Sequence, residues 1–159
     1  MTVVACPAAI VTADVHVVWA LLMDPSSYHR WWTLQTTNIR PSGRARPGQQ
    51  LTARMPIAGI GRDILTIIEM VDDTQYQMEV RMLLPLGITL RAHIVCVPLE
   101  RRTCRVQIGS DLRFPPGLRG RCIERLAAKR CLRHIDTALS QIKGLAECAG
   151  RVVSQSSFP

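Results

Sequence analysis

The stretch that decides the fold is IVTADVHVVW, residues 10–19, in which the spacing of apolar residues changes from two to three and four. Up to residue 11 apolar and other residues alternate, which predicts a first strand over residues 3–11. Within it, Cys6, Ala8 and Ile10 are the alternating positions. Pro7 has no N–H to donate to a ladder, so we expect an edge or a bulge at this point.

An amphipathic helix is expected to follow the strand. Its apolar residues have the spacing i, i+3, i+4, i+7, and they are Val15, Val18, Trp19 and Leu22. Thr12 is the predicted N-cap, and Asp14 is well placed for the first turn. The helix should end near Met23. Asp24 and Pro25 then begin a second short helix as its cap and first residue, with Tyr28, Trp31 and Trp32 on or just beyond it.

From residue 34 to residue 112 the period is two, and turn signals divide the segment into about six strands. Short strands joined by hairpins predict an antiparallel meander with one wet and one apolar face. The clearest inward row is Tyr76, Met78, Val80 and Met82. A second row is Ile64, Thr66, Ile68 and Met70. Two further rows are Leu90, Ala92, Ile94 and Cys96, and Cys104, Val106, Ile108 and Leu112. This assignment places His93 on the outer face.

A long final helix is expected after Pro115-Pro116-Gly117. Its apolar face repeats at steps of three and four, and consists of Leu132, Ile135, Leu139, Ile142 and Ala146. The pattern ends near Cys148, about 45 Å from the start of the helix. We therefore predict one domain over residues 1–150 and a loose tail over residues 151–159.

The net charge is +8, and nearly all of the cations are arginines. A basic balance is compatible with nucleic acid, anionic membranes or acidic small molecules. However, the arginines are scattered and no basic stretch is interleaved with aromatic residues, so we favour a solvated basic surface and expect no nucleic acid partner. No apolar run is long enough to span a bilayer and no secretory signal is visible, which makes a cytoplasmic protein the default.

The six cysteines indicate reduced thiols rather than a metal site. They are Cys6, Cys96, Cys104, Cys122, Cys131 and Cys148, and they form no CxxC pair and no zinc-ribbon spacing. Cys131 and His134 lie one helical turn apart, but two ligands do not make a site. We predict no metal and no cofactor. A hairpin centred on Glu100 would place Cys96 directly opposite Cys104 on the inner face.

The order of strand, two short helices, six meander strands and one long helix resembles the SRPBCC superfamily, the START or Bet v 1-like helix-grip fold. The likeness is densest at residues 10–19, at Asp24-Pro25, and at residues 28–32, which read YHRWW. It covers about residues 3–148 and is closest to the polyketide cyclase/dehydrase and lipid-transport group. The resemblance implies an α+β fold, with a curved antiparallel sheet of about seven strands around a long C-terminal helix.

In this fold the void between sheet and helix holds apolar ligands, so the inward residues are the candidate lining of a cavity. The predicted lining consists of Trp31, Trp32, Arg54, Arg62, Ile64, Thr66, Ile68, Tyr76, Met78, Val80, Met82, Leu90, Ile94, Leu132, Ile135 and Leu139. The same rows would suit a filled core equally well. Trp31 and Trp32 are adjacent, so one is expected in the core and the other at the mouth. Arg62 is either a rim residue that meets an anionic group or an ordinary surface arginine.

Three functions remain open at this point. The first is binding or carriage of a hydrophobic small molecule, lipid or polyketide-like. The second is an aromatase/cyclase-like enzyme that cyclises and dehydrates a poly-β-keto chain, with Arg54 or Arg62 steadying the enolate. The third is a protein-interaction module, because Leu65 and Ile67 lie on the supposed outer face. These two residues are equally compatible with a homodimer contact.

Overall fold

The computed structural model describes residues 2–32, 34–57, 60–115 and 120–155. The strands are β1 Thr2–Ala5, β2 Ala8–Val11, β3 Gln35–Arg40, β4 Gln50–Ile57, β5 Ile60–Asp72, β6 Gln77–Leu83, β7 Thr89–Glu100 and β8 Thr103–Arg113. The helices are α1 Val15–Leu22, η1 Pro25–Arg30, η2 Pro85–Gly87 and α2 Gly120–Gln155. The predicted order of elements is therefore confirmed. Residues 116 and 117 of the predicted turn before α2 lie outside the described residues.

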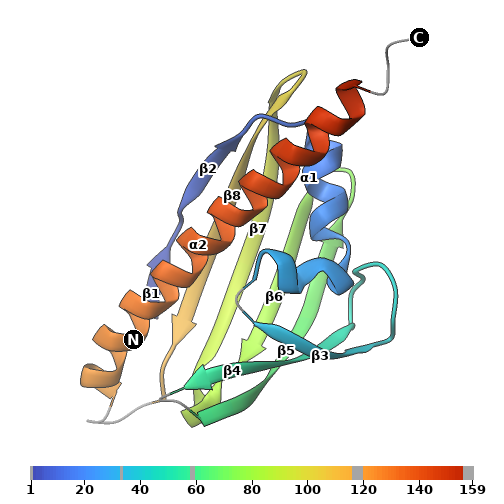
Figure 1. The fold of residues 1–159 in the computed structure, drawn as a ribbon. Coiled ribbons are helices and arrows are strands. Elements are labelled where there is room, and N and C mark those ends of the chain that lie inside the picture. Colours follow the sequence, from blue (N-terminus) through green and yellow to red (C-terminus); the bar gives the residue numbers. More distant parts are fainter. Residues whose placement is uncertain (1, 33, 58–59, 116–119, 156–159) are drawn as a thin grey trace.

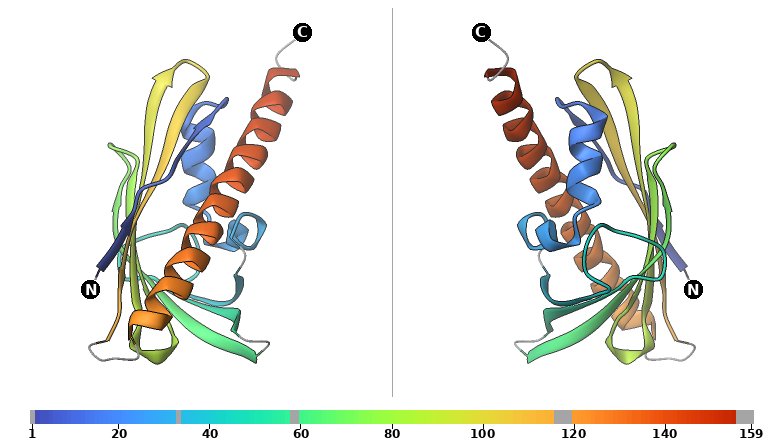
Figure 2. Two further views of the ribbon diagram at one scale, coloured as in Figure 1. Left: turned by 90° about the vertical axis from the view of Figure 1, so that its left-hand side faces the viewer. Right: turned by 90° about the vertical axis from the view of Figure 1, so that its right-hand side faces the viewer.

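All strands belong to one antiparallel sheet with the order β1-β8-β7-β6-β5-β4-β3 (Figure 1). Strand β2 also pairs with β8, so β1 and β2 share one edge position and the sheet is seven strands wide. The sheet curves around α2, which crosses its open side (Figures 1 and 2). This arrangement confirms the predicted α+β helix-grip fold.

The first strand is broken at Cys6 and Pro7, where the Pro7 carbonyl accepts a 3.0 Å hydrogen bond from the N–H of Ile108. The predicted edge or bulge at Pro7 is thus confirmed. Ala9 and Val11 pair with Val106 and Cys104, which face the core. Successive side chains alternate, and therefore Cys6, Ala8 and Ile10 are the exposed residues.

Helix α1 begins two residues later than predicted, because its N-cap is Asp14 rather than Thr12. The Asp14 carboxylate accepts a 2.8 Å hydrogen bond from the N–H of His16. The Thr12 N–H instead donates to Oε1 of Glu147 on α2, at 3.0 Å. The predicted apolar face of α1 is buried, and Met23 is the C-cap as expected. Asp24 caps η1 by accepting from the N–H of Ser26 at 3.0 Å.

Helix α2 packs on the sheet and on α1 through the second half of its length. Its buried residues are Ile135, Ala138, Leu139, Ile142 and Ala146. Leu132 was predicted on the same face but is 37% exposed, whereas the adjacent Cys131 packs against the core. The helix continues to Gln155, past the predicted end near Cys148. None of the helices in the described ranges is long and apolar enough to cross a membrane.

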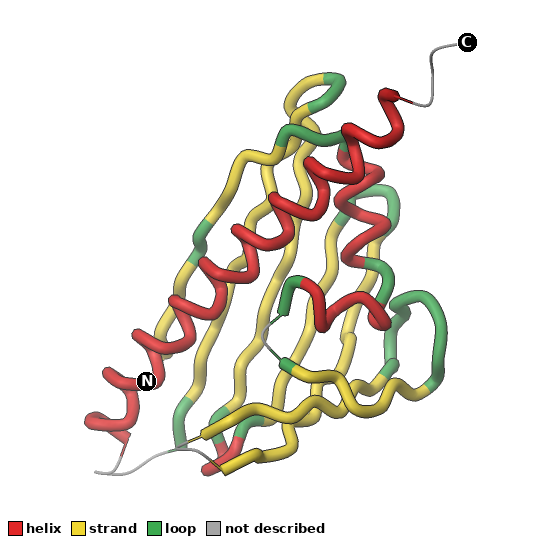
Figure 3. The backbone as a smooth tube through the Cα atoms, viewed as in Figure 1, coloured by secondary structure: helices red, strands yellow, loops and turns green. Residues whose placement is uncertain are grey.

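The loop between β3 and β4 is fastened to both layers of the fold. It reaches the end of α1, where the Ala45 N–H donates to the Met23 carbonyl at 2.9 Å (Figure 3). On the other side the Gly48 N–H donates to the Ile68 carbonyl at 2.8 Å. The buried amide of Gln49 holds the loop from within, donating to the Pro41 carbonyl at 2.7 Å. These bonds hold the loop between the end of α1 and strand β5.

Candidate functional site

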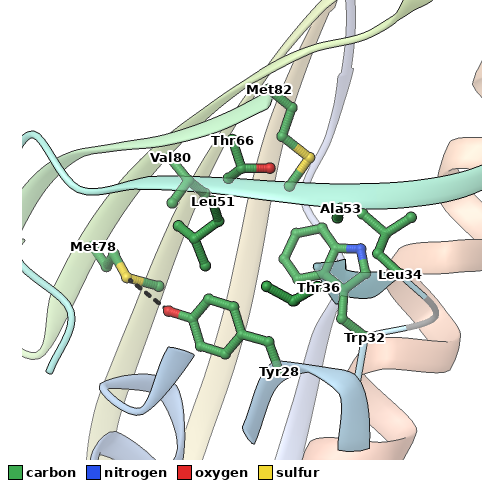
Figure 4. Close-up of a pocket in the computed structure, with 10 residues that line it drawn as sticks. All are labelled: Tyr28, Trp32, Leu34, Thr36, Leu51, Ala53, Thr66, Met78, Val80 and Met82. Atoms are coloured by element: carbon green, nitrogen blue, oxygen red, sulfur yellow. Dashed lines mark hydrogen bonds between the residues drawn. The ribbon is translucent and has the colours of Figure 1, made fainter. Parts of the chain in front are cut away.

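A small cavity lies between η1 and the inner face of strands β3 to β6 (Figure 4). Its walls are formed by Tyr28, Trp32, Leu34, Thr36, Leu51, Ala53, Thr66, Met78, Val80 and Met82. The cavity volume is about 20 Å³. A volume of this size holds about one water molecule.

Strand register explains why the cavity forms at this place. Leu51 on β4 is opposite Thr66 on β5, and Thr66 is opposite Met82 on β6, so the three side chains form one row across the sheet. Ala53 lies in the next row and is opposite Ile64. Thr66 and Ala53 are short inward residues at neighbouring positions on this concave surface. The void is therefore a consequence of two small residues at neighbouring positions.

Tyr28 closes the cavity from the η1 side. Its hydroxyl donates a 2.8 Å hydrogen bond to the Leu22 carbonyl and lies 3.8 Å from Sδ of Met78. Burial, with a smaller contribution from the charge of Asp24, raises the pKa of Tyr28 above its ordinary value. The phenol is thus neutral at physiological pH, and its proton is held by a backbone carbonyl.

Three further polar groups reach the cavity wall: the hydroxyls of Thr36 and Thr66 and the indole N–H of Trp32. None of them bonds to another residue in the described part of the chain. The lining residues include no carboxylate, imidazole, ammonium, guanidinium or thiol. Such a wall can hold an apolar group and one hydrogen-bonding atom, but it lacks a pair of groups for acid–base chemistry.

Five of the predicted lining residues meet at this cavity: Trp32, Thr66, Met78, Val80 and Met82. Seven others are buried in the core without bordering it: Trp31, Ile64, Ile68, Leu90, Ile94, Ile135 and Leu139. The expected division of the tryptophan pair is therefore found. Trp31 is fully buried, and Trp32 is half-buried at the cavity wall.

Four predicted lining residues lie elsewhere. Arg54 is on the outer face beside Asp63, with its Nε 3.5 Å from a carboxylate oxygen. Arg62 is exposed near the β4–β5 hairpin, beyond the last buried row of the sheet. Tyr76 precedes β6 in the turn and packs edge-on against Trp19 and His16. Leu132 lies on the flank of α2, as described above. Neither Arg54 nor Arg62 therefore has its guanidinium at the cavity.

Sequence reasoning missed Tyr28, Leu34, Thr36, Leu51 and Ala53 as lining residues. For two of them a signal was present, because Leu51 and Ala53 alternate with Thr52 and Arg54. That alternation marks Leu51 and Ala53 as inward and Arg54 as outward.

The inner cysteines are close neighbours but are not directly opposed. Cys96 is opposite Val106, and Cys104 is opposite Pro98. The hairpin turns at Arg101 and Arg102 instead of at Glu100, and the register shifts between Pro98 and Glu100. Both thiols are free and buried. Burial is the main cause that raises the pKa of Cys96 to about 12 and that of Cys104 to about 11.

Other candidate groups do not assemble into a site. His93 is exposed on the outer face, as predicted, while Leu65 and Ile67 are half-buried there. Within the described residues no three His, Cys, Asp or Glu side chains gather as metal ligands, and Cys131 and His134 belong to no such group.

The comparison with family models decides the family. The model for polyketide cyclase / dehydrase and lipid transport matches residues 7–147. The chain belongs to this family. A comparison with curated proteins found no match. The match confirms the resemblance that the N-terminal motif indicated.

Solved structures with the same fold are similar over nearly the whole chain. The Zhui aromatase/cyclase from Streptomyces sp. R1128 has a TM-score of 0.77 at 15% identity, covering 92% of this chain and 94% of that one. A START superfamily protein from Mycobacterium smegmatis has a TM-score of 0.68 at 19% identity, with 92% and 98% covered. Norcoclaurine synthase from Thalictrum flavum has a TM-score of 0.69 at 17% identity, with 92% and 94% covered. At these identities the likeness concerns the fold alone.

Proposed function

We propose that this protein binds a hydrophobic small molecule, lipid or polyketide-like, in the interior space between η1 and strands β3 to β6. The observation that carries the proposal is the apolar cavity, whose wall offers three polar groups without a partner among the described residues. Family membership and a fold shared with ligand-binding and cyclising proteins support it.

The cavity must widen to accept such a ligand. Sites for drug-sized molecules have volumes of roughly 300–1,000 Å³, against about 20 Å³ here. The side chains that would move are Met78, Met82 and the half-buried Trp32. Methionine is unbranched and repacks at low cost, so two of the three are suited to this movement. The ligand would then replace side-chain contacts with its own.

The lining favours binding over catalysis. Cyclisation and dehydration of a poly-β-keto chain require proton transfer by a positioned acid or base. Tyr28 is the one ionisable residue of the wall, and its proton is committed to the Leu22 carbonyl. Its raised pKa makes it a poor base at neutral pH. We therefore place the aromatase/cyclase function second.

Native mass spectrometry of the purified protein, followed by organic extraction, tests the proposal. We expect an apolar compound bound at one molecule per chain, or uptake of an environment-sensitive apolar dye. In Ala53→Leu the added side chain fills the void, so the bound mass and the dye signal should be lost while the protein stays folded. Thr52→Leu makes a similar change at the adjacent outward position and should bind as the parent does.

Two results would count against this site. A parent protein with a clean apo mass and no dye uptake would show a closed core. Equal binding by the parent and Ala53→Leu would show that the ligand lies elsewhere. Formation of a cyclised product from a poly-β-keto substrate would move the assignment to the enzyme.

A further inference from the structure

The first half of α2 carries a cluster of cations on the side turned away from the sheet. Arg125, Lys129, Arg130 and Arg133 are all exposed, and no Asp or Glu occurs between residues 125 and 134. Leu126 stands among them and is 74% exposed, the highest value of any large hydrophobic residue in the described part of the chain. We call these five residues the basic face.

Helical spacing places the members of the basic face together. Leu126, Lys129, Arg130 and Arg133 stand at i, i+3, i+4 and i+7, so they form one stripe. The buried Ile135 lies on the opposite side of the helix, against the sheet. Figure 1 shows α2 in front of the sheet, with no other element drawn over its first half. The basic face is therefore open to a partner.

Some of the exposed cations of the molecule have an acidic partner, and others do not. Arg81 and Arg91 share Glu69, Arg113 pairs with Asp111, and Arg44 pairs with Asp73. In contrast, none of the four cations of the basic face forms an ion pair within the described residues. Glu124 and Asp136 flank the basic face along the helix, but neither is within ion-pair distance of its cations, so these remain available to an external anion.

We propose that the basic face docks on an anionic lipid bilayer, with the cations at the headgroups and Leu126 inserted at the acyl boundary. Basic side chains are attracted to anionic headgroups, and a single exposed leucine among them can reach the acyl boundary. Each such cation is attracted to anionic lipid with about a fivefold gain in partitioning. A single-stranded nucleic acid would need aromatic stacking residues, and the basic face has none. This surface lies outside the cavity and does not depend on it.

Co-sedimentation of the full chain with vesicles tests the proposal. We expect binding to vesicles of phosphatidylcholine mixed with phosphatidylglycerol, weak binding to phosphatidylcholine alone, and a loss of binding at high salt. The double variant Lys129→Glu/Arg130→Glu should weaken partitioning at least about 25-fold, because two cations are lost. Leu126→Ser should weaken it about tenfold, because the apolar anchor is lost. Both changes are at exposed positions, and circular dichroism checks that the variants fold.

The matched control is Arg101→Glu/Arg105→Glu, which makes the same change in net charge. These exposed arginines lie at the β7–β8 hairpin, at the other end of the molecule from the first half of α2 (Figures 1 and 2). This control should keep parental binding. Equal losses in both double variants would reduce the effect to net charge and overturn the site. Binding to duplex DNA without binding to anionic vesicles, or unchanged partitioning of Leu126→Ser, would also overturn the proposal. Ala53→Leu should sediment normally, so the cavity and the membrane surface are tested separately.

Discussion

The indole nitrogen of Trp19 donates a 2.7 Å hydrogen bond to Oδ1 of Asp73, 54 residues further along the chain. Arg44 pairs with both oxygens of the same carboxylate. The Asp73 side chain thus joins α1, the β3–β4 loop and the β5–β6 turn. The hydrogen bonds from Arg44 and then from Trp19 lower the pKa of Asp73 to about 2.

Asp73→Asn is expected to lower the free energy of unfolding by about 1 kcal/mol at neutral pH, because the half-exposed ion pair is worth little more. The pKa of Asp73 is lower in the folded than in the unfolded state. The contribution of the ionised Asp73 side chain to the free energy of unfolding is therefore complete above about pH 4, and it is lost as the pH falls through about 2. Urea denaturation across this pH range should show the free energies of unfolding of the parent and Asp73→Asn converging as the pH falls. A difference between them that stays constant at acid pH would contradict the lowered pKa of Asp73.

Trp31 and Trp32 should differ in their effect on stability. Trp31 is fully buried and packs edge-on against Tyr28, with ring centroids 4.8 Å apart. Trp31→Ala should cost about 3–5 kcal/mol. Trp32→Ala should cost less than half as much, because Trp32 is half-buried, and it should enlarge the cavity. Denaturant titration measures both, and equal costs would contradict the placement of the pair.

Trp31→Phe provides a finer test of the same site. The Nε1 atom of Trp31 is buried without a hydrogen-bond partner among the described residues. Replacement by phenylalanine removes this unpaired donor, so the cost should come from lost volume alone. We expect Trp31→Phe to be much closer in stability to the parent than Trp31→Ala.

Thiol labelling at mildly alkaline pH should separate the cysteines into two classes. Cys6 and Cys148 are exposed, whereas Cys96 and Cys104 are buried with raised pKa values. Alkylation followed by peptide mass mapping should modify the first pair in the native protein and the second pair only after unfolding. The pKa values of Cys96 and Cys104 are higher in the folded than in the unfolded state. Burial of these neutral thiols therefore contributes fully to the free energy of unfolding below about pH 8.5, and this contribution is lost as the pH rises towards 11–12. Rapid native labelling of Cys96 would contradict its burial.

Ile142→Ala should be one of the costliest substitutions in α2. Ile142 is fully buried where α2 meets the core, so its truncation should lower the free energy of unfolding by about 2–5 kcal/mol. The adjacent Lys143 is exposed, and Lys143→Ala should change stability by less than about 0.5 kcal/mol. Thermal or urea denaturation of the pair checks the orientation of the helix, which would be wrong if the two effects were reversed.

Periodicity predicted the elements well because it reports on which side of an element the core lies. The four apolar positions of α1 and the inward rows of β5 to β8 follow from sequence alone. Register is less accessible. The placement of Cys96 opposite Cys104 failed because the position of one turn shifts every pair in a hairpin. Which face of β2 is buried is likewise set by its pairing with β8, more than ninety residues away in the sequence.

The candidate cavity was only half predictable for a different reason. Alternation identifies inward residues, and it led to Thr66, Met78, Val80 and Met82. It does not tell which inward residues border a void, because that depends on how η1 lies over the curved sheet. Ile64 and Ile94 are also inward residues by alternation, but they belong to the filled core.

The edge of the sheet joins segments that are remote in sequence. Val3 is opposite Leu112, Ala8 is opposite Gln107, and Thr12 bonds to Glu147. During synthesis, strands β3 to β6 can pair with their neighbours as they emerge, but β1 and β2 have no partner until β8 is complete. The inner face of the sheet also stays uncovered until residues near Ile142 have been added. Closing loops of this length is entropically slow. The fold therefore carries a kinetic cost, with an aggregation-prone apolar face open for most of the time that the chain takes to be made.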